Sequence, residues 1–169
     1  MISVLRTALV ALGLVVSIQA TASQQQDNDT REIERVMQVF HQAVAGHDGA
    51  TLESLFLPGA HLVNVLDDER FATAKAKAAD AEQVKIGAAH DFAQFVSTSK
   101  ASLNPVHSNV RVTTDGWVAT VYFDFVFNID GKPQNAGSET WQLVHGGKDW
   151  KIASISYSSH LPGHEDAPR

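Results

Sequence analysis

The stretch of residues 117–128 constrains the fold of this chain more than any other. Its odd-numbered positions are all apolar, whereas its even-numbered positions mix apolar and polar residues. Successive side chains of a β-strand point to opposite faces of the sheet, so the pattern predicts a long strand with one face in a core and the other face half polar. The positions assigned to the core are Trp117, Ala119, Val121, Phe123, Phe125 and Phe127.

Turn signals place this strand in an antiparallel meander. Asp-Gly pairs at 115–116 and 130–131, and Gly-Gly at 146–147, separate segments that alternate in polarity. Such pairs are typical of β-hairpin turns. Four meander strands are therefore predicted, at residues 106–113, 117–128, 136–145 and 150–158. In the first of them, the alternation assigns the valines to one face and His107 to the opposite, polar face.

The N-terminal half has the apolar spacing of helices. Asp29 is followed three positions later by Glu32, which is the spacing of a capping box, so a helix is predicted to begin at Asp29. Gly46 is expected to end it. The apolar stripe of this helix consists of Ile33, Val36, Met37, Phe40 and Val44.

The rest of the N-terminal half is less regular. A short helix is predicted from Asp48 to the residue before Pro58, then a strand at residues 60–66 and a third helix at 90–97. Residues 67–89 are rich in Ala, Lys and Asp and follow no clear period. They are interpreted as a long, mobile excursion with a helical bias.

Composition excludes several classes of protein. The 169 residues include 19 acidic and 13 basic side chains, giving a net charge of −6, whereas a nucleic-acid-binding protein needs a basic surface. The absence of cysteine excludes disulfides, thiolate metal sites and cysteine nucleophiles. The eight histidines show no metal-ligand spacing, and no glycine-rich nucleotide motif is present. No metal and no cofactor are therefore predicted.

The first 22 residues have the pattern of a cleaved secretory signal. Arg6 precedes an apolar run at 7–18, and Ala20-Thr21-Ala22 supplies the small residues of a cleavage site. The run is shorter than the roughly 20 residues of a membrane span. The prediction is an exported protein, periplasmic or secreted, with no membrane span after cleavage.

The predicted organisation is simple. A signal peptide at 1–22 is followed by a flexible leader at 23–28, one domain at 29–159 and a loose tail at 160–169.

Four short stretches carry a resemblance to a known superfamily. They are FHQAVAGHD at 40–48, LESLFLPGA at 52–60, SETWQLV at 138–144 and WKI at 150–152. In this order the chain resembles the nuclear transport factor 2-like superfamily, which includes SnoaL-like domains, ketosteroid isomerases and scytalone dehydratases. The resemblance implies an α+β fold in which a cone-shaped, curved antiparallel sheet wraps on about three N-terminal helices around an internal cavity.

Glu139 is the most informative residue for function. It shares a strand face with Trp141 and Leu143, so its carboxylate is expected to lie at a wet rim, to pair with a base, or to stay protonated with a raised pKa. The residues predicted to line the cavity are Phe40, Leu62, Asn64, Phe123, Phe125, Glu139 and Trp141.

The resemblance also allows a test for isomerase chemistry. The isomerases use a carboxylate base on the first strand, a helix-one tyrosine and an acid on the strand before the last. By position these fall at Asn64, at Val39 or Phe40, and near Glu139. Only the last retains its group, so isomerase chemistry of that type is not expected.

Three functions follow as hypotheses. The first is a domain that binds a small apolar or aromatic molecule, the second a lyase, isomerase or hydrolase with Glu139 as its acid/base, and the third a structural or partner-binding subunit with a filled cavity. Tyr122 and Val126 make the outer sheet face half apolar, so homodimerisation through that face is also predicted.

Overall fold

The computed structural model describes the backbone of residues 5–160 and the side chains of residues 24–160. The loose tail predicted beyond residue 160 lies outside this range. The described residues form four helices: α1 (Leu5–Ala45), α2 (Gly49–Ser54), α3 (Asp68–Lys77) and α4 (Ala89–Thr98). Six strands complete the order: β1 (Phe56–Leu66), β2 (Val84–Ala88), β3 (Leu103–Thr114), β4 (Val118–Ile129), β5 (Lys132–His145) and β6 (Trp150–Ser159).

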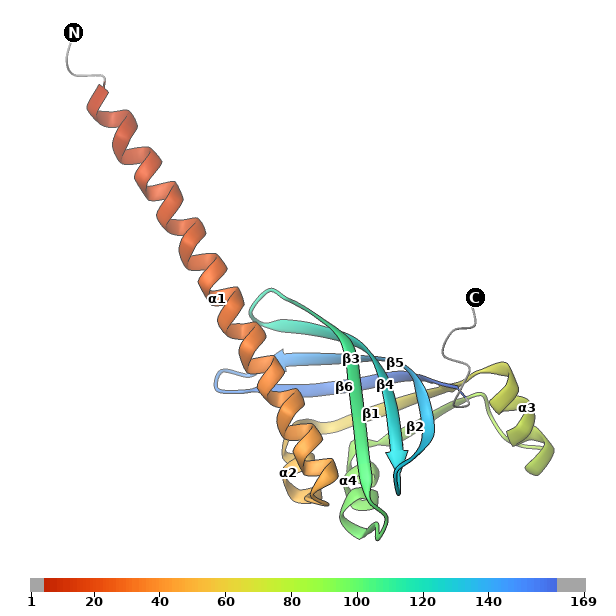
Figure 1. Ribbon diagram of the computed structural model, residues 1–169. Coiled ribbons are helices and arrows are strands. Elements are labelled where there is room, and N and C mark those ends of the chain that lie inside the picture. Colours follow the sequence, from red (N-terminus) through yellow and green to blue (C-terminus); the bar gives the residue numbers. More distant parts are fainter. Residues whose placement is uncertain (1–4, 161–169) are drawn as a thin grey trace.

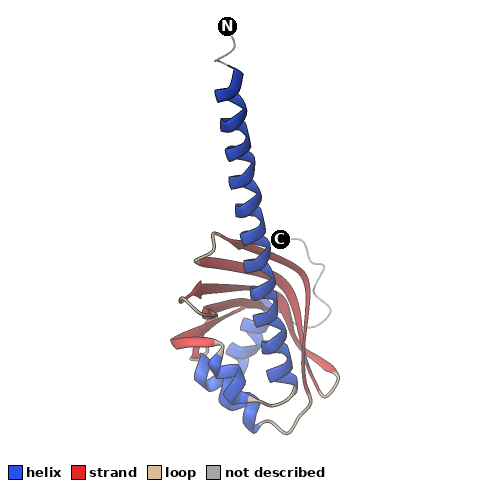
Figure 2. Ribbon diagram, turned by 90° about the vertical axis from the view of Figure 1, so that its left-hand side faces the viewer, coloured by secondary structure: helices blue, strands red, loops and turns tan. Residues whose placement is uncertain are grey.

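The strands form one curved sheet in the order β2-β1-β6-β5-β4-β3. The meander of β3 to β6 is antiparallel, as predicted, but β1 runs parallel to β6, so the sheet is mixed rather than antiparallel. The chain between β1 and β6 is long and contains helices and the other strands. The two strands can therefore pair in parallel, which a short hairpin turn would not allow. The helices α1, α2 and α4 lie on the concave side of the sheet (Figure 1; Figure 2). The α+β class is confirmed.

Helix α1 is longer than predicted. It begins at Leu5, and its N-terminal part extends away from the sheet (Figure 1). Asp29 is therefore no N-cap: it lies inside the helix, is 5 % exposed and accepts a hydrogen bond of 3.0 Å from Gln25 Nε2. No proline separates residues 22 and 29, so nothing in this stretch stops the helix, and the predicted leader at 23–28 is helical. Among the described residues, no helix is sufficiently long and apolar to cross a membrane.

The predicted apolar faces form the core. The stripe of α1 packs on the inner face of the meander, and Ile33, Val44, Val121 and Phe123 are fully buried. Burial of each such side chain contributes about 1.5–3 kcal/mol to folding. Trp117 departs from the prediction, with 68 % of its surface exposed.

Trp117 is exposed because it belongs to the turn before β4. The carboxylate of Asp115 accepts hydrogen bonds of 2.9 Å from the backbone N–H groups of both Trp117 and Val118. This aspartate turn directs the indole outward, and the alternating core face begins at Ala119 instead.

Residues 67–89 contain regular structure, the helix α3 and the strand β2. Asp67 caps α3 by accepting a 2.7 Å hydrogen bond from the N–H of Arg70, which agrees with the predicted helical bias. The following strand β2 was not predicted, and it pairs with β1 with Val63 opposite Ile86. All residues of β2 are exposed, and the alternation of Val84 and Ile86 with Lys85 is too short to stand out from the Ala- and Lys-rich stretch around it.

His160 also belongs to the domain rather than to the tail. It bridges to Ala136, and its Nδ1 lies 3.2 Å from Oδ2 of Asp67.

Candidate functional site

A cavity of about 250 Å³ lies between the sheet and the helices α1 and α4. Its wall is mostly aromatic, with one carboxyl, one imidazole, one phenol and one amide among the apolar side chains. This mixture is typical of small-molecule sites. The lining residues are Phe40, Leu62, Phe92, Phe95, Pro105, His107, Phe125, Phe127, Asn135, Glu139, Ile155 and Tyr157.

The structure divides the predicted lining residues into two groups. Phe40, Leu62, Phe125 and Glu139 line the cavity. Phe123 and Trp141 do not, because both are fully buried behind that wall. Trp141 packs at 4.7 Å between ring centroids on Phe40 and at 5.5 Å on Phe123, so these aromatics support the cavity from beneath.

Asn64 is the remaining predicted residue, and it too is not part of the lining. It is half-buried on the same face of β1 as Leu62, with Tyr157 opposite it on β6. Its Oδ1 is buried without a hydrogen-bond partner among the described residues. An unpaired buried amide oxygen is costly, so Asn64 offers an unused acceptor next to the cavity wall.

Glu139 carries the one carboxyl of this wall. Burial raises its pKa from 4.5 to about 7, and the hydrogen bond that Trp141 Nε1 donates to its Oε1 opposes part of that rise. No Lys, Arg or His of the described residues forms an ion pair with it. The side chain is half-buried because its carboxyl faces the cavity, and the apolar neighbours remove its hydration.

Tyr157 lies directly beside this carboxyl. It pairs with Glu139 across β5 and β6 and with Asn64 across β6 and β1. Burial raises the pKa of the Tyr157 hydroxyl, the charge of Glu139 raises it further, and Arg70 opposes both. Asn64, Tyr157 and Glu139 therefore form a polar row across three neighbouring strands on the inner face of the sheet.

His107 lines the cavity, which contradicts its assignment to the polar face of β3. Between Ser108 and Arg111, β3 advances three residues while β4 advances two, and Asn109 takes a φ of 53°. This bulge inverts the inward and outward positions, so the odd-numbered residues before it point inward. Asparagine tolerates positive φ, and Asn109 was the available signal.

The environment of His107 keeps its ring neutral. The ring centroid lies 4.4 Å from that of Phe123 and 5.8 Å from that of His41. Burial first, and the charge of His41 second, lower the pKa of His107 to about 4. At neutral pH the imidazole therefore has one nitrogen that donates and one that accepts a hydrogen bond.

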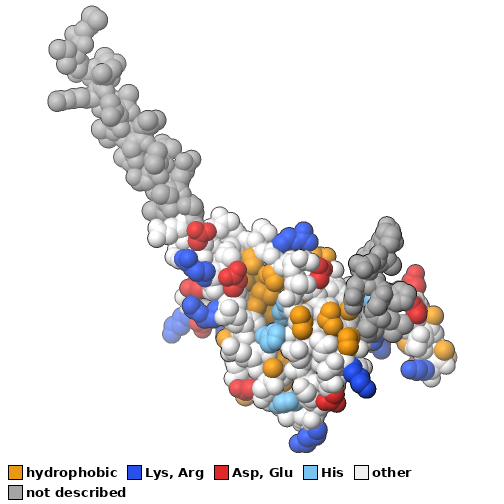
Figure 3. Space-filling view, in the orientation of Figure 1, with side chains coloured by type: hydrophobic (Ala, Val, Ile, Leu, Met, Phe, Trp, Pro, Cys, Tyr) orange, Lys and Arg blue, Asp and Glu red, His pale blue; other side chains and the backbone are white. Residues whose placement is uncertain are grey.

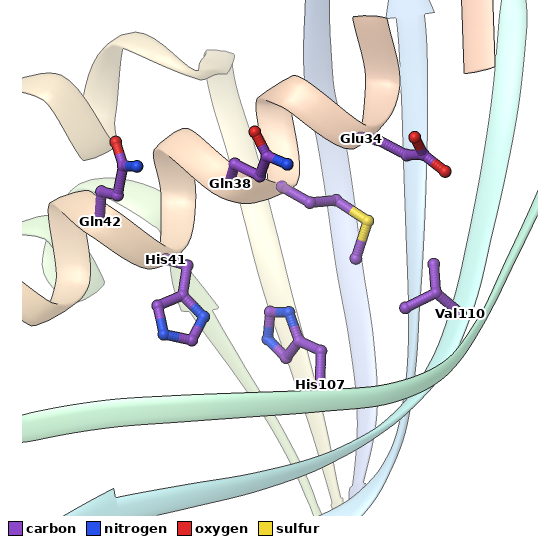
Figure 4. Close-up of a pocket in the computed structure, with 7 residues that line it drawn as sticks. Glu34, Gln38, His41, Gln42, His107 and Val110 are labelled. Carbon is purple, nitrogen blue, oxygen red and sulfur yellow. The ribbon is translucent and has the colours of Figure 1, made fainter. Parts of the chain in front are cut away.

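A second hollow, of about 440 Å³, lies between α1 and β3 and is open to solvent. His41 and His107 point toward each other across it (Figure 4). Histidine and apolar side chains gather beside α1 on this face of the molecule (Figure 3). The lining residues are Glu34, Met37, Gln38, His41, Gln42, His107 and Val110. His107 thus belongs to the walls of both hollows.

In the described part of the chain, no group of three or more His, Asp or Glu side chains is placed to hold a metal ion. The cavity instead combines a carboxyl that titrates near neutral pH with a neutral imidazole and a phenol. Such groups can hydrogen-bond a ligand, and they can also donate or accept a proton.

Solved structures share this fold at low sequence identity. A protein of unknown function from Mycobacterium tuberculosis aligns with a TM-score of 0.63 at 13% identity, covering 86% of this chain and 80% of its own. A candidate scytalone dehydratase from Novosphingobium aromaticivorans gives 0.62 at 13%, covering 82% and 89%. A candidate dehydratase of the NTF2-like family from Streptomyces avermitilis gives 0.60 at 17%, covering 80% and 99%.

Family membership comes from the sequence itself. No curated protein matches the chain. The model of the SnoaL-like domain, however, matches residues 33–162, which include the helical stripe of α1 and every strand of the sheet. The cavity residues from Phe40 to Tyr157 all lie inside that match. The chain therefore belongs to the family of SnoaL-like domains and has the NTF2-like fold.

Proposed function

We propose that this protein binds a small, largely apolar or aromatic molecule in the cavity, with Glu139 as the polar anchor. The observation that carries the proposal is a carboxyl set in an aromatic wall, with a hydrogen bond from Trp141 and no paired cation among the described residues. A protonated carboxyl both donates and accepts, so it can orient a ligand hydroxyl or carbonyl at little desolvation cost. The open volume of about 250 Å³ argues against a cavity filled by its own side chains.

Two matched ligands test the polar anchor. 2-Naphthol and naphthalene have the same aromatic body and differ by one hydroxyl, and their binding can be followed by titration calorimetry. Glu139→Leu should weaken 2-naphthol about tenfold and leave naphthalene unchanged, because only the hydroxyl loses a partner. If neither compound binds the wild-type protein, and native mass spectrometry of protein from its own host finds no retained molecule, the proposal is wrong.

A second candidate function is acid/base catalysis in the same cavity. The pKa of Glu139 near 7 and the neutral ring of His107 favour it, since a general acid or base works best when its pKa is close to the operating pH. Two of the similar structures are named as candidate dehydratases. The corresponding reaction would remove a proton next to a carbonyl and protonate the leaving hydroxyl, releasing water and leaving a carbon–carbon double bond.

A simple substrate tests that reaction. 4-Hydroxy-4-phenylbutan-2-one would lose water to a conjugated ketone whose absorbance can be followed. Enzymatic turnover should depend on pH with an apparent pKa near 7 and should be lost in Glu139→Gln, which keeps the shape of the side chain and removes its proton transfer. Turnover equal to the uncatalysed rate would leave binding as the function.

We infer further that the protein is exported, periplasmic or secreted. The support is the charged, apolar and small-residue pattern of residues 1–22. In that case ligand binding takes place outside the cytoplasm.

A further inference from the structure

The inner cavity is small for a ligand site. Its volume of about 250 Å³ is below the range of about 300–1,000 Å³ that is usual for small-molecule pockets. The hollow between α1 and β3 adds about 440 Å³ directly beside it. A ligand of ordinary size therefore needs both spaces.

His107 is the wall that the two spaces share. Its ring packs on Phe123 on one side and faces His41 on the other, and it is half-buried rather than enclosed. His107, held on the bulged strand β3, is the one residue common to the two linings, so the aromatic cavity and the open hollow meet at its ring.

The chemistry of the two spaces differs. The inner wall is mainly aromatic. In the outer hollow, Glu34, Gln38 and Gln42 follow one another at intervals of four along α1, so they lie on one face of the helix, and all three are exposed. The two amides and His41 offer hydrogen-bond donors and acceptors, and Glu34 is the single acid of this lining. This surface suits an uncharged, hydrogen-bonding group better than an anion.

We propose that the ligand is an elongated, uncharged molecule whose aromatic or apolar part occupies the inner cavity and whose hydroxyl- or amide-rich part passes His107 into the hollow between α1 and β3. This inference rests on the proposed binding function. It names the class of ligand: an aromatic body with an uncharged polar substituent, as in an aryl glycoside.

Two probes separate the contributions of the spaces. 2-Naphthol fits the description of the inner part alone, and 6-hydroxy-2-naphthyl β-D-glucopyranoside keeps a free hydroxyl for Glu139 and adds a hydroxyl-rich group at the opposite end of the same aromatic body. Both are titrated against the full chain by calorimetry. Gln38→Trp fills the outer hollow from α1, and Val110→Trp fills it from β3. Arg35→Trp is the matched control, since Arg35 is exposed on the same helix and lines a different surface hollow beside Lys148 and Trp150.

The expected result is selective. Gln38→Trp and Val110→Trp each weaken the glucoside about tenfold and leave 2-naphthol within about twofold, whereas Arg35→Trp changes neither. If one filling variant fails to fold by circular dichroism, the other gives the answer, because they enter the hollow from opposite sides.

The contrary results are distinguishable. If 2-naphthol binds but the glucoside does not bind, or binds without any response to both filling variants, the extended site is wrong and the inner binding site remains. If the wild-type protein binds neither compound, the extended site and the proposed binding function fail together.

Discussion

Replacing Glu139 with glutamine isolates the free energy that its buried carboxyl costs the folded protein. In the unfolded chain this group has the ordinary pKa near 4.5, whereas burial raises its pKa to about 7 in the folded protein. Between these two pH values the unfolded chain releases the proton and the folded protein keeps it. Stability therefore falls as the pH rises through this window.

The magnitude follows from the two pKa values. One pKa unit corresponds to about 1.4 kcal/mol, so the cost reaches about 3 kcal/mol above pH 7, where the carboxyl is ionised in both states. Below about pH 4.5 the cost is absent because both states are protonated. Glutamine keeps the acceptor for Trp141 Nε1 and cannot ionise, so it removes the cost.

Urea denaturation at pH 4, 5.5, 7 and 8, followed by tryptophan fluorescence, measures the difference. Glu139→Gln should match the wild type at pH 4 and exceed its free energy of unfolding by up to about 3 kcal/mol at pH 8. His107 titrates in both proteins, so its contribution largely cancels from the difference. Glu82→Gln is the control, because Glu82 is exposed and its replacement should give no such trend. A stability difference independent of pH would refute the reasoning, and a destabilised variant at pH 8 would indicate a cation partner.

Three further results are expected. His107 has a pKa of about 4 when folded, so in the same denaturation assay the wild type should lose up to about 3 kcal/mol relative to His107→Phe between pH 6.5 and 4; both proteins share the opposing contribution of Glu139, which the difference removes. If the outer sheet face forms a homodimer, Tyr122→Asp should shift the protein to monomer in sedimentation without unfolding it; a wild-type monomer at high concentration would contradict this. N-terminal sequencing of exported protein should find Ser23 as the first residue, and finding Met1 there would contradict signal cleavage.

The fold was predictable where burial leaves a period in the sequence. The odd-numbered apolar positions of β4 indicated its core face, and the turn pairs indicated the meander. The prediction that Trp117 is buried was wrong because the hydrogen bonds of Asp115 place this residue in a turn. The alternation of residue types does not indicate that turn. β2 was missed although Val84 and Ile86 alternate with Lys85, because the strand has only five residues and lies within a stretch rich in Ala, Lys and Asp.

The site was predictable only in part, and different features of the backbone and the sequence explain what was missed. Glu139 was identified because its strand β5 has no irregularity between residues 139 and 141, so face assignment was reliable there. His107 was assigned to the wrong face because the bulge at Asn109 shifts the alternation by one position. Tyr157 was missed since its strand contains several serines, and no pattern separates the inner from the outer face.

The parallel pairing of β1 with β6 has a consequence for the order in which the protein acquires its shape. β6 is the last strand within residues 5–160, and it lies between β1 and β5. Because the first and last strands are about 90 residues apart, their pairing requires a large loop to close and is expected to form late. A nascent chain that lacks residues 150–159 lacks the strand that lies between Asn64 and Glu139, so the wall of the cavity is incomplete. For a chain exported in the proposed way, the cavity could not be completed until all residues up to Ser159 had crossed the membrane, and the ligand would first meet its site on the far side.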